Sequence, residues 1–422
     1  MKKTNFFLAI FAGIMLTSCK STYTETVTYK INEPVFMGRN DFQNTARVSQ
    51  SAQPIENHGK ICFFNGFIYM AETGKGIHII DNTDPANPQI VGFIELLGNA
   101  DMSIRDRVLY ADSFTDLVWF DLSNSAVPEP LGRLANAFYE VLPPLENEYG
   151  YDYGQVYNNR QSNDSVIVGW TLVERTEDVE HYYRGGWWNG AYDDAALAGA
   201  ENSGGAKTGI NGSMSRFSLY DNYLYSVINN QMSIIDLRGE PCIAVSNFYI
   251  GYNVETLFNY EDKMFMGTPT GMLIYSVENP LEPKYCSAVQ HVFGCDPVVV
   301  ENDRAYVTVH SGNNCGQDFN ELIIINVADV YRPQQIVSYT MTRPMGLGID
   351  NGTLFVCDDG LKIFNTENPQ TIMANELAHY SGMSGYDVIA FNNLLMMIAE
   401  DGIYQYDYSD LNNIVPLSVI NW

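Results

Sequence analysis

The stretch GIHIIDNTDPANPQIVG, residues 76–92, decides the fold, because variants of it return along the whole chain. Ile77, Ile79 and Asp81 alternate apolar and polar side chains, as in a half-buried strand. A turn rich in Asp and Pro follows, and residues 89–94 predict a second strand. The repeating unit is therefore strand, turn and strand.

Seven copies of this unit can be aligned on the polar residue that ends its first strand. Successive anchors are separated by 40, 115, 40, 50, 39 and 42 residues. A period near 40 made only of strands predicts four-stranded blades, and hence an all-β chain forming a single β-propeller. We expect seven blades, with eight as the alternative. The anchors are Asp81, Asp121, Asp236, Ser276, Asn326, Asn365 and Asp407.

The propeller is expected to span residues 58–422, interrupted by an insertion at 132–213 that is rich in aromatic residues and glycine. Residues 166–183 alternate well enough to predict a hairpin that extends a blade or is the remnant of an eighth. Seven inner strands are predicted, at residues 61–64, 102–104, 215–219, 255–258, 297–300, 346–349 and 388–391.

The charge balance excludes some classes of partner. Lys and Arg number 23 against 50 Asp and Glu, which gives a net charge of −27. This balance repels phosphate backbones, so nucleic acid is not an expected partner. Cations, neutral ligands and basic proteins remain, although an acidic surface also serves solubility alone.

The N-terminus predicts export. A basic start and an apolar run at 6–16 form a signal peptide over residues 1–18, too short to span a membrane. Leu-Thr-Ser-Cys at 16–19 resembles a bacterial lipobox, which implies lipidation of Cys19 and anchoring to the outer membrane. Cell-surface and periplasm-facing placements both stay open. Residues 20–28 predict a polar tether within an N-terminal segment, 19–57, whose later part packs on or closes the ring.

Export also permits disulfides. Cys295 and Cys315 flank one predicted hairpin and could pair, or remain free. The other cysteines of the mature chain are expected to be small hydrophobic residues, and no spacing resembles a zinc site.

Residues that start the inner strands should ring the mouth of the central channel. Four of them are carboxylates, which could hold a hard cation such as Ca²⁺. The alternative is that each carboxylate caps backbone N–H groups at its own strand start. The four are Asp101, Glu255, Asp296 and Asp387.

The insertion emerges on the same face as this mouth, so its aromatic rings could form a platform for sugars. Alternatively, the rings cover the insertion's own backbone. Beyond the four carboxylates, the candidate ligand-binding residues on this face are Trp187, Trp188, Arg216, His291, His310 and Arg343.

The repeated motif resembles the LVIVD repeat of extracytoplasmic bacterial β-propellers. The segments GNADMSIRDRVLYADSFTDLVWFDL, CDPVVVENDRAYVTVHSGNNC and DGIYQYDYSD are similar to lipoprotein members from Bacteroides-like bacteria. The resemblance implies a propeller fold and an envelope location. It implies no activity, so no catalytic residue is assigned.

The sequence favours a non-enzymatic envelope lipoprotein that binds a protein or glycan partner through the insertion-bearing face. The alternative is a hydrolase or lyase that acts on polysaccharide with carboxylates at the channel mouth. A purely structural part of a larger envelope complex is a third reading, and the oligomeric state stays open.

Overall fold

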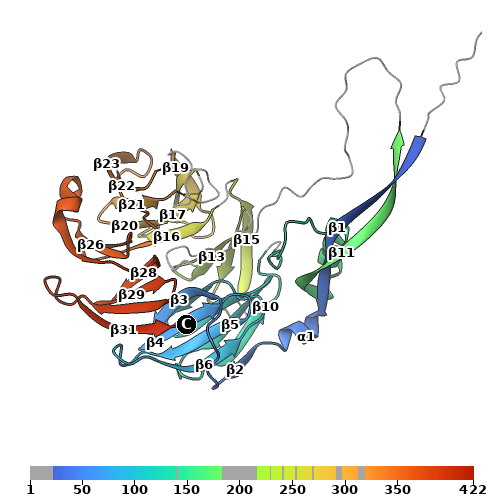
Figure 1. Cartoon of the computed structure of the whole chain (residues 1–422), viewed down its shortest axis with the longest axis horizontal. Coiled ribbons are helices and arrows are strands. Elements are labelled where there is room, and N and C mark those ends of the chain that lie inside the picture. The colour runs from blue at the N-terminus through green and yellow to red at the C-terminus, as the bar shows by residue number, and fades with distance from the viewer. Residues whose placement is uncertain are drawn as a thin grey trace, which may run out of the picture.

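The chain folds into a ring of seven four-stranded antiparallel blades with one projecting arm (Figure 1). The computed structural model describes residues 22–138, 141–182, 216–228, 230–239, 242–251, 254–268, 270–290, 297–311 and 319–422. The prediction of an all-β, seven-bladed propeller is confirmed.

Each blade is a meander that runs from its inner strand outward in sequence order. Blade 1 also carries a fifth strand, β2 (Arg47–Ser49), on its outer edge. The first four blades are β3 to β6 (His58–Phe64, Phe67–Glu72, Gly76–Asp81, Gln89–Glu95), β7 to β10 (Met102–Arg105, Val108–Ser113, Asp116–Asp121, Glu129–Leu134), β12 to β15 (Phe217–Tyr220, Tyr223–Ile228, Gln231–Asp236, Ile243–Tyr249) and β16 to β19 (Thr256–Tyr260, Lys263–Thr268, Gly271–Ser276, Lys284–Gln290).

Three further blades complete the ring, and the predicted inner strands agree with the observed ones to within a few residues. These blades are β20 to β23 (Val298–Glu301, Arg304–Val309, Glu321–Asn326, Gln334–Thr340), β24 to β27 (Leu347–Asp350, Thr353–Cys357, Leu361–Asn365, Glu376–Tyr380) and β28 to β31 (Gly385–Phe391, Leu394–Ala399, Gly402–Asp407, Val415–Asn421). A 3-10 helix, η1 (Pro369–Asn375), connects β26 to β27.

In every blade, the hairpin between the first two strands begins with a residue of positive φ. This left-handed conformation matches the twist of two-residue hairpins and favours Asn, Asp and Gly. The residues are Asn65, Asp106, Asp221, Glu261, Asn302, Asn351 and Asn392.

The seven anchor residues share one role. The side-chain oxygen of each accepts a hydrogen bond from the backbone N–H two residues later, for example Asp81 from Thr83 at 3.0 Å and Asp407 from Ser409 at 2.8 Å. The same bond occurs at Asp121, Asp236, Ser276, Asn326 and Asn365. In each blade the residue after the anchor also donates its N–H to a carbonyl in the first hairpin. The anchor therefore fixes the turn between the third and fourth strands.

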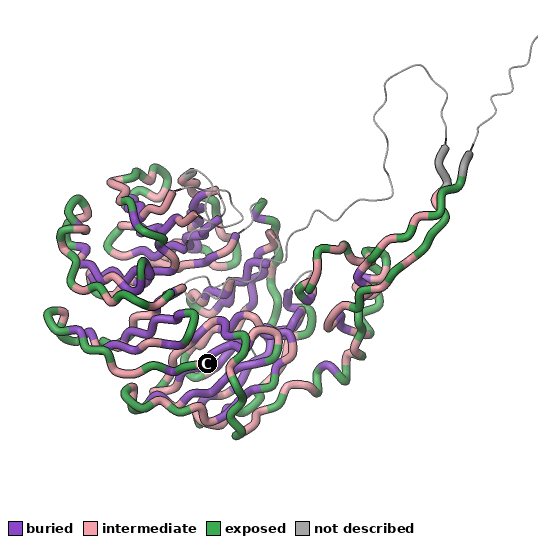
Figure 2. Tube along the Cα trace, viewed as in Figure 1, coloured by how far each residue is buried: buried purple, intermediate pink, exposed green. Residues whose placement is uncertain are grey.

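Apolar side chains between adjacent blades form the core (Figure 2). The ring closes where blade 7 packs on blade 1, through Ile68 and Met70 on one side and Met396 and Ile398 on the other. Each of these two blades consists of consecutive strands, so no strand is shared across the seam. Among the described residues, contacts of side chains therefore hold the closure.

The arm is a two-stranded antiparallel ribbon of β1 (Thr22–Gly38) and β11 (Ser165–Tyr182). It projects away from the propeller (Figure 1), and two short helices, α1 (Arg39–Gln43) and α2 (Tyr153–Ser162), lie at its root. Among the described residues, no helix is both long and apolar enough to cross a membrane.

One prediction about these segments was wrong. Residues 166–182 form one strand rather than a hairpin, and this strand belongs to no blade. Its partner is the segment predicted as a tether, which from Thr22 onward is a strand. The hairpin was mispredicted because each segment has an alternating, β-branched sequence that pairs with the other, far away in the chain.

We expect Asp81→Ala to destabilise the propeller by about 1 kcal/mol, because the N–H of Thr83 loses its acceptor. Asp81→Asn keeps an oxygen at the same reach and should cost less. Denaturant unfolding of both variants measures the difference. Equal losses in the two variants would contradict the assigned role.

Candidate functional site

The insertion-bearing face is the end of the propeller that carries the outer-to-inner connections and the turns between second and third strands. In a meander these two kinds of connection emerge together. The structure shows it at blade 2, where Asn99 before β7 donates from its amide to Asp112 at the end of β8, at 3.0 Å. By the same topology, the insertion leaves the end of β10 on this face, and β21 ends and β22 begins on it.

Several predicted site residues lie outside the described residues, and their roles stay predictions. The four cysteines that are described, Cys62, Cys242, Cys286 and Cys357, form no disulfide with one another and are buried or half-buried. The undescribed candidates are Cys19, Trp187, Trp188, His291, Cys295, Asp296 and Cys315.

Asp101 lies on this face and is brought together with Arg216. Its side chain is buried, lies 3.2 Å from the Lys60 ammonium, and accepts the backbone N–H groups of Met102 and Arg216 at 2.7 and 2.6 Å. The carboxylate thus joins the inner strand of blade 2 to that of blade 3. Asp101 therefore caps backbone N–H groups. Sequence reasoning missed Lys60, although it follows Gly59 at a predicted strand start.

A second buried carboxylate, Asp112, lies beside Asp101 and was also missed. It accepts the N–H groups of Ala100 and Asp101 at 2.6 and 2.9 Å. Burial raises the pKa of Asp112 to about 6, against the lowering effect of nearby Arg216 and of these donors. No sequence signal marks Asp112. The candidate carboxylates were those that start an inner strand, whereas Asp112 lies near the end of the second strand of its blade.

The other predicted residues are distributed among blades. Asp387 is buried in β28 and accepts the N–H of Val388 at 2.8 Å. Glu255 precedes β16, His310 follows β21, and Arg343 is exposed in the connection to blade 6. Within the part of the chain that is described, no three His, Cys, Asp or Glu side chains group so as to hold a metal ion.

The arm joins the propeller on this face through a buried charge cluster. Asp116, whose side chain is fully buried, receives Arg39 from the arm root at 2.9 Å and Arg133 from β10 at 3.0 Å. Phe42 of α1 packs against Phe114 in the same place. Two cations on one buried carboxylate fix the arm to blade 2.

Polar groups also fill the seam between blades 7 and 1 on this face. The His78 ring nitrogen Nε2 lies 2.9 Å from the Glu72 carboxylate, and the His58 ring packs against the Trp422 ring at a tilt of 37°, with centroids 3.9 Å apart. Burial lowers the pKa of His78, although Glu72 acts in the opposite direction. The Nδ1 atom of His78 is buried without a partner in the described structure, so a proton there would have no acceptor.

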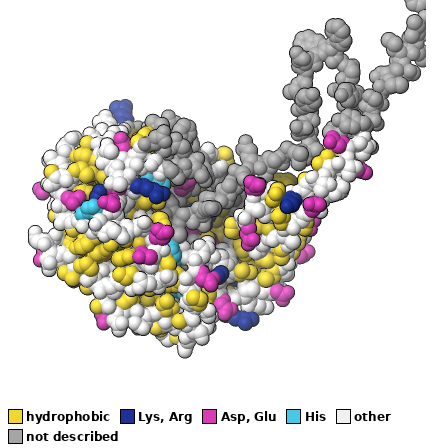
Figure 3. Space-filling view, viewed as in Figure 1, with side chains coloured by type: hydrophobic (Ala, Val, Ile, Leu, Met, Phe, Trp, Pro, Cys, Tyr) yellow, Lys and Arg dark blue, Asp and Glu magenta, His cyan; other side chains and the backbone are white. Residues whose placement is uncertain are grey.

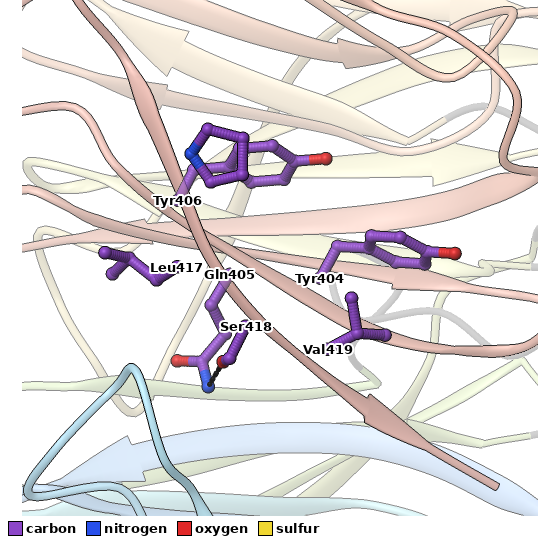
Figure 4. A pocket seen from close by; sticks show the side chains of 7 residues that line it. Tyr404, Gln405, Tyr406, Leu417, Ser418 and Val419 are labelled. Atoms are coloured by element: carbon purple, nitrogen blue, oxygen red, sulfur yellow. Dashed lines mark hydrogen bonds between the residues drawn. The ribbon is translucent and has the colours of Figure 1, made fainter.

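A small cavity of about 250 Å³ lies in blade 7 between β30 and β31 (Figure 4). Its amide, Gln405, exchanges two 2.8 Å hydrogen bonds with Asn82 of blade 1 and donates to Ser418. Ser418 in turn donates to the carbonyl of Pro85. The polar groups of this cavity belong to the ring closure rather than to a ligand site.

Comparison with known proteins gives no family. No family model matches the sequence, and no curated protein matches it. The structure is similar to the computationally designed Ika8 protein (9% identity, 88% of each chain, TM-score 0.48) and to Kluyveromyces lactis Hsv2p (10% identity, 87% of this chain and 99% of that one, TM-score 0.46). A functionally unknown protein from Desulfotomaculum acetoxidans DSM 771 matches at 12% identity over 49% of this chain and 69% of its own, with a TM-score of 0.40. These similarities are too distant to carry an argument about function.

We expect Arg39→Ala to loosen the arm while leaving the blades intact, because the variant loses the ion pair from the arm root to Asp116. Hydrogen exchange followed by mass spectrometry should be faster in β1 and α1 and unchanged in blades 4 to 6. Asp116→Asn should cost more, about 3 kcal/mol, since it strands two arginines. Arg107→Ala removes an exposed arginine of the same blade and is the control. Equal hydrogen exchange in β1 and α1 of all variants would contradict the role of Asp116 in fixing the arm to blade 2.

The seam predicts a pH dependence of stability. Because the pKa of folded His78 lies below its unfolded value, the unfolded state binds more protons between the two values, and stability falls as pH drops. The raised pKa of Asp112 acts in the opposite direction. We therefore expect the free energy of unfolding to fall less in His78→Gln than in the parent chain when the pH is lowered from about 7.5 to about 5.5. Parallel stability profiles for the two chains would contradict this role.

Proposed function

We propose that this chain is a non-enzymatic lipoprotein of the cell envelope, anchored to the outer membrane through Cys19, whose propeller recognises a protein or glycan partner. The observation that carries the proposal is the arm. Its first described residue, Thr22, follows Cys19 by three positions, and its root lies on the insertion-bearing face. A lipid at Cys19 would therefore attach near one end of the arm, with the propeller at the other.

The length of the arm suits this arrangement. The 17 residues of β1 extend over roughly 55 Å at the usual rise of a strand. Electrostatic interactions between exposed charges fade over about 8 Å at physiological ionic strength. An arm of this length therefore removes an acidic propeller from the field of anionic headgroups.

The charge of the propeller makes that separation useful. The chain carries a net charge of −27, and acidic side chains are spread over the visible face of the molecule (Figure 3). A propeller held directly on an anionic membrane would be repelled from it. When the propeller is held at the end of the arm, its surface is free to contact a partner instead.

The experiment is metabolic labelling with an alkyne fatty acid in a bacterial host, followed by membrane fractionation. We expect the parent chain to be labelled and membrane-bound, and Cys19→Ala to lose both properties while remaining folded. Cys62→Ala, which changes a half-buried thiol of the propeller, is the control and should keep the label. Label retained in Cys19→Ala, or a parent chain without label, would overturn the anchor.

A further inference from the structure

An open groove lies at the root of the arm, where α2 runs beside β1. It is shallow and open to solvent, with a volume of about 400 Å³. The described residues that line it are one aromatic residue and five neutral residues with amide or hydroxyl groups. They are Phe36, Gln155, Asn158, Asn159, Ser162 and Ser165.

The ring of Phe36 is presented by a β-bulge. The register of the arm shifts between Val35, which pairs with Gly169, and Phe36, which pairs with Ile167, so Val168 has no partner. Bulges of this kind redirect side chains, often beside functional sites. Phe36 is left 42% exposed in a groove whose other lining side chains are all polar.

The helix supplies the polar wall. At about 100° per residue, Gln155, Asn158, Asn159 and Ser162 fall on one side of α2, while Tyr153 falls on the other. A side-chain cap fixes the start of this helix, because Asp152 accepts the N–H of Gln155 at 3.0 Å. The polar wall is therefore held in place by the fold itself.

Part of the hydrogen-bonding capacity of this wall is unused. Gln155 donates its amide to Asp152 at 3.0 Å, and Asn159 donates its amide to Ser165 at 2.6 Å. Within the described residues, the side-chain oxygens of these two amides accept no hydrogen bond. The Asn158 side chain is exposed and unbonded within the same residues. Two carbonyl acceptors and one whole amide thus remain for a ligand.

We propose that this groove binds a neutral saccharide unit of a glycan. A sugar offers an apolar C–H face to the Phe36 ring and hydroxyl groups to the amides of Gln155, Asn158 and Asn159. None of the six lining residues is charged, and the net charge of −27 disfavours anionic sugars. The groove belongs to the arm root rather than to a blade, so this inference goes beyond the proposed function and rests on it only in that the chain recognises a partner.

The test uses the full chain in mild detergent and a panel of neutral trisaccharides built from glucose, xylose or mannose, with trigalacturonate as the anionic comparison. Saturation-transfer NMR should detect at least one neutral trisaccharide. Phe36→Ala should weaken its binding about tenfold, equivalent to about 1.4 kcal/mol, and Asn158→Ala should also weaken it. The control is Tyr153→Ala, which removes a 62% exposed aromatic from the opposite side of α2 and should leave binding within about twofold.

Three results would overturn the proposal: no neutral trisaccharide bound, binding of trigalacturonate alone, or neutral binding lost in Tyr153→Ala but kept in Phe36→Ala. Phe36 is exposed, so the variant is expected to fold, and Asn158→Ala provides a second measure if it does not. Failure here leaves the acylation and fractionation results unchanged. Failure of the Cys19 anchor, in turn, leaves the NMR result unchanged, so the two proposals fail separately.

Discussion

The propeller depends on a hydrogen bond that occurs once in every blade, from a backbone N–H to the side-chain oxygen of the residue that ends the third strand. The bond needs an acceptor at a short reach and needs no charge. This explains why Asp, Asn and Ser all occupy the position, at Asp81, Ser276 and Asn326 among others. Such a polar residue is therefore evidence about the blade and says nothing about chemistry on the opposite face.

Closing the ring is a separate problem, since a repeat that packs only on its neighbours leaves two unmatched ends. Here the two ends meet through polar side chains as well as apolar ones. The reciprocal amide bonds of Asn82 and Gln405 fix the register of blade 7 against blade 1, because a displaced amide would lose two bonds at once. On the insertion-bearing face, Trp422 at the end of the chain adds its contact with His58. Specific polar contacts thus fix the register of the two blades, which apolar packing alone would not determine.

Sequence reasoning succeeded where the determinants are local. Strand spacing, hairpin turns and the anchors lie within one repeat, so the seven blades could be predicted. The arm could not, because β1 and β11 pair across more than a hundred residues, as in the bond from Thr26 to Asp178. For the same reason, Asp101 could be placed on its face but not given its partner, which is the backbone of Arg216, distant in sequence. The groove at Phe36 combines both distant segments, and neither segment signals it alone.

An isolated two-stranded ribbon is marginal in water, so the arm needs explanation as a structure. Its outer part is bound by cross-strand side chains, with Thr28 bonded to Thr176 and Arg175 to Glu33. At its root, Arg175 also reaches Asp152 at the start of α2, and Arg39 reaches Asp116 in the propeller. The outer strand residues are largely polar, as both faces of a ribbon surrounded by water require. A segment that extended from the body only to add stability would bury apolar surface. The outer part of this one lies in solvent, as the proposed role of a spacer between a lipid anchor and the propeller requires.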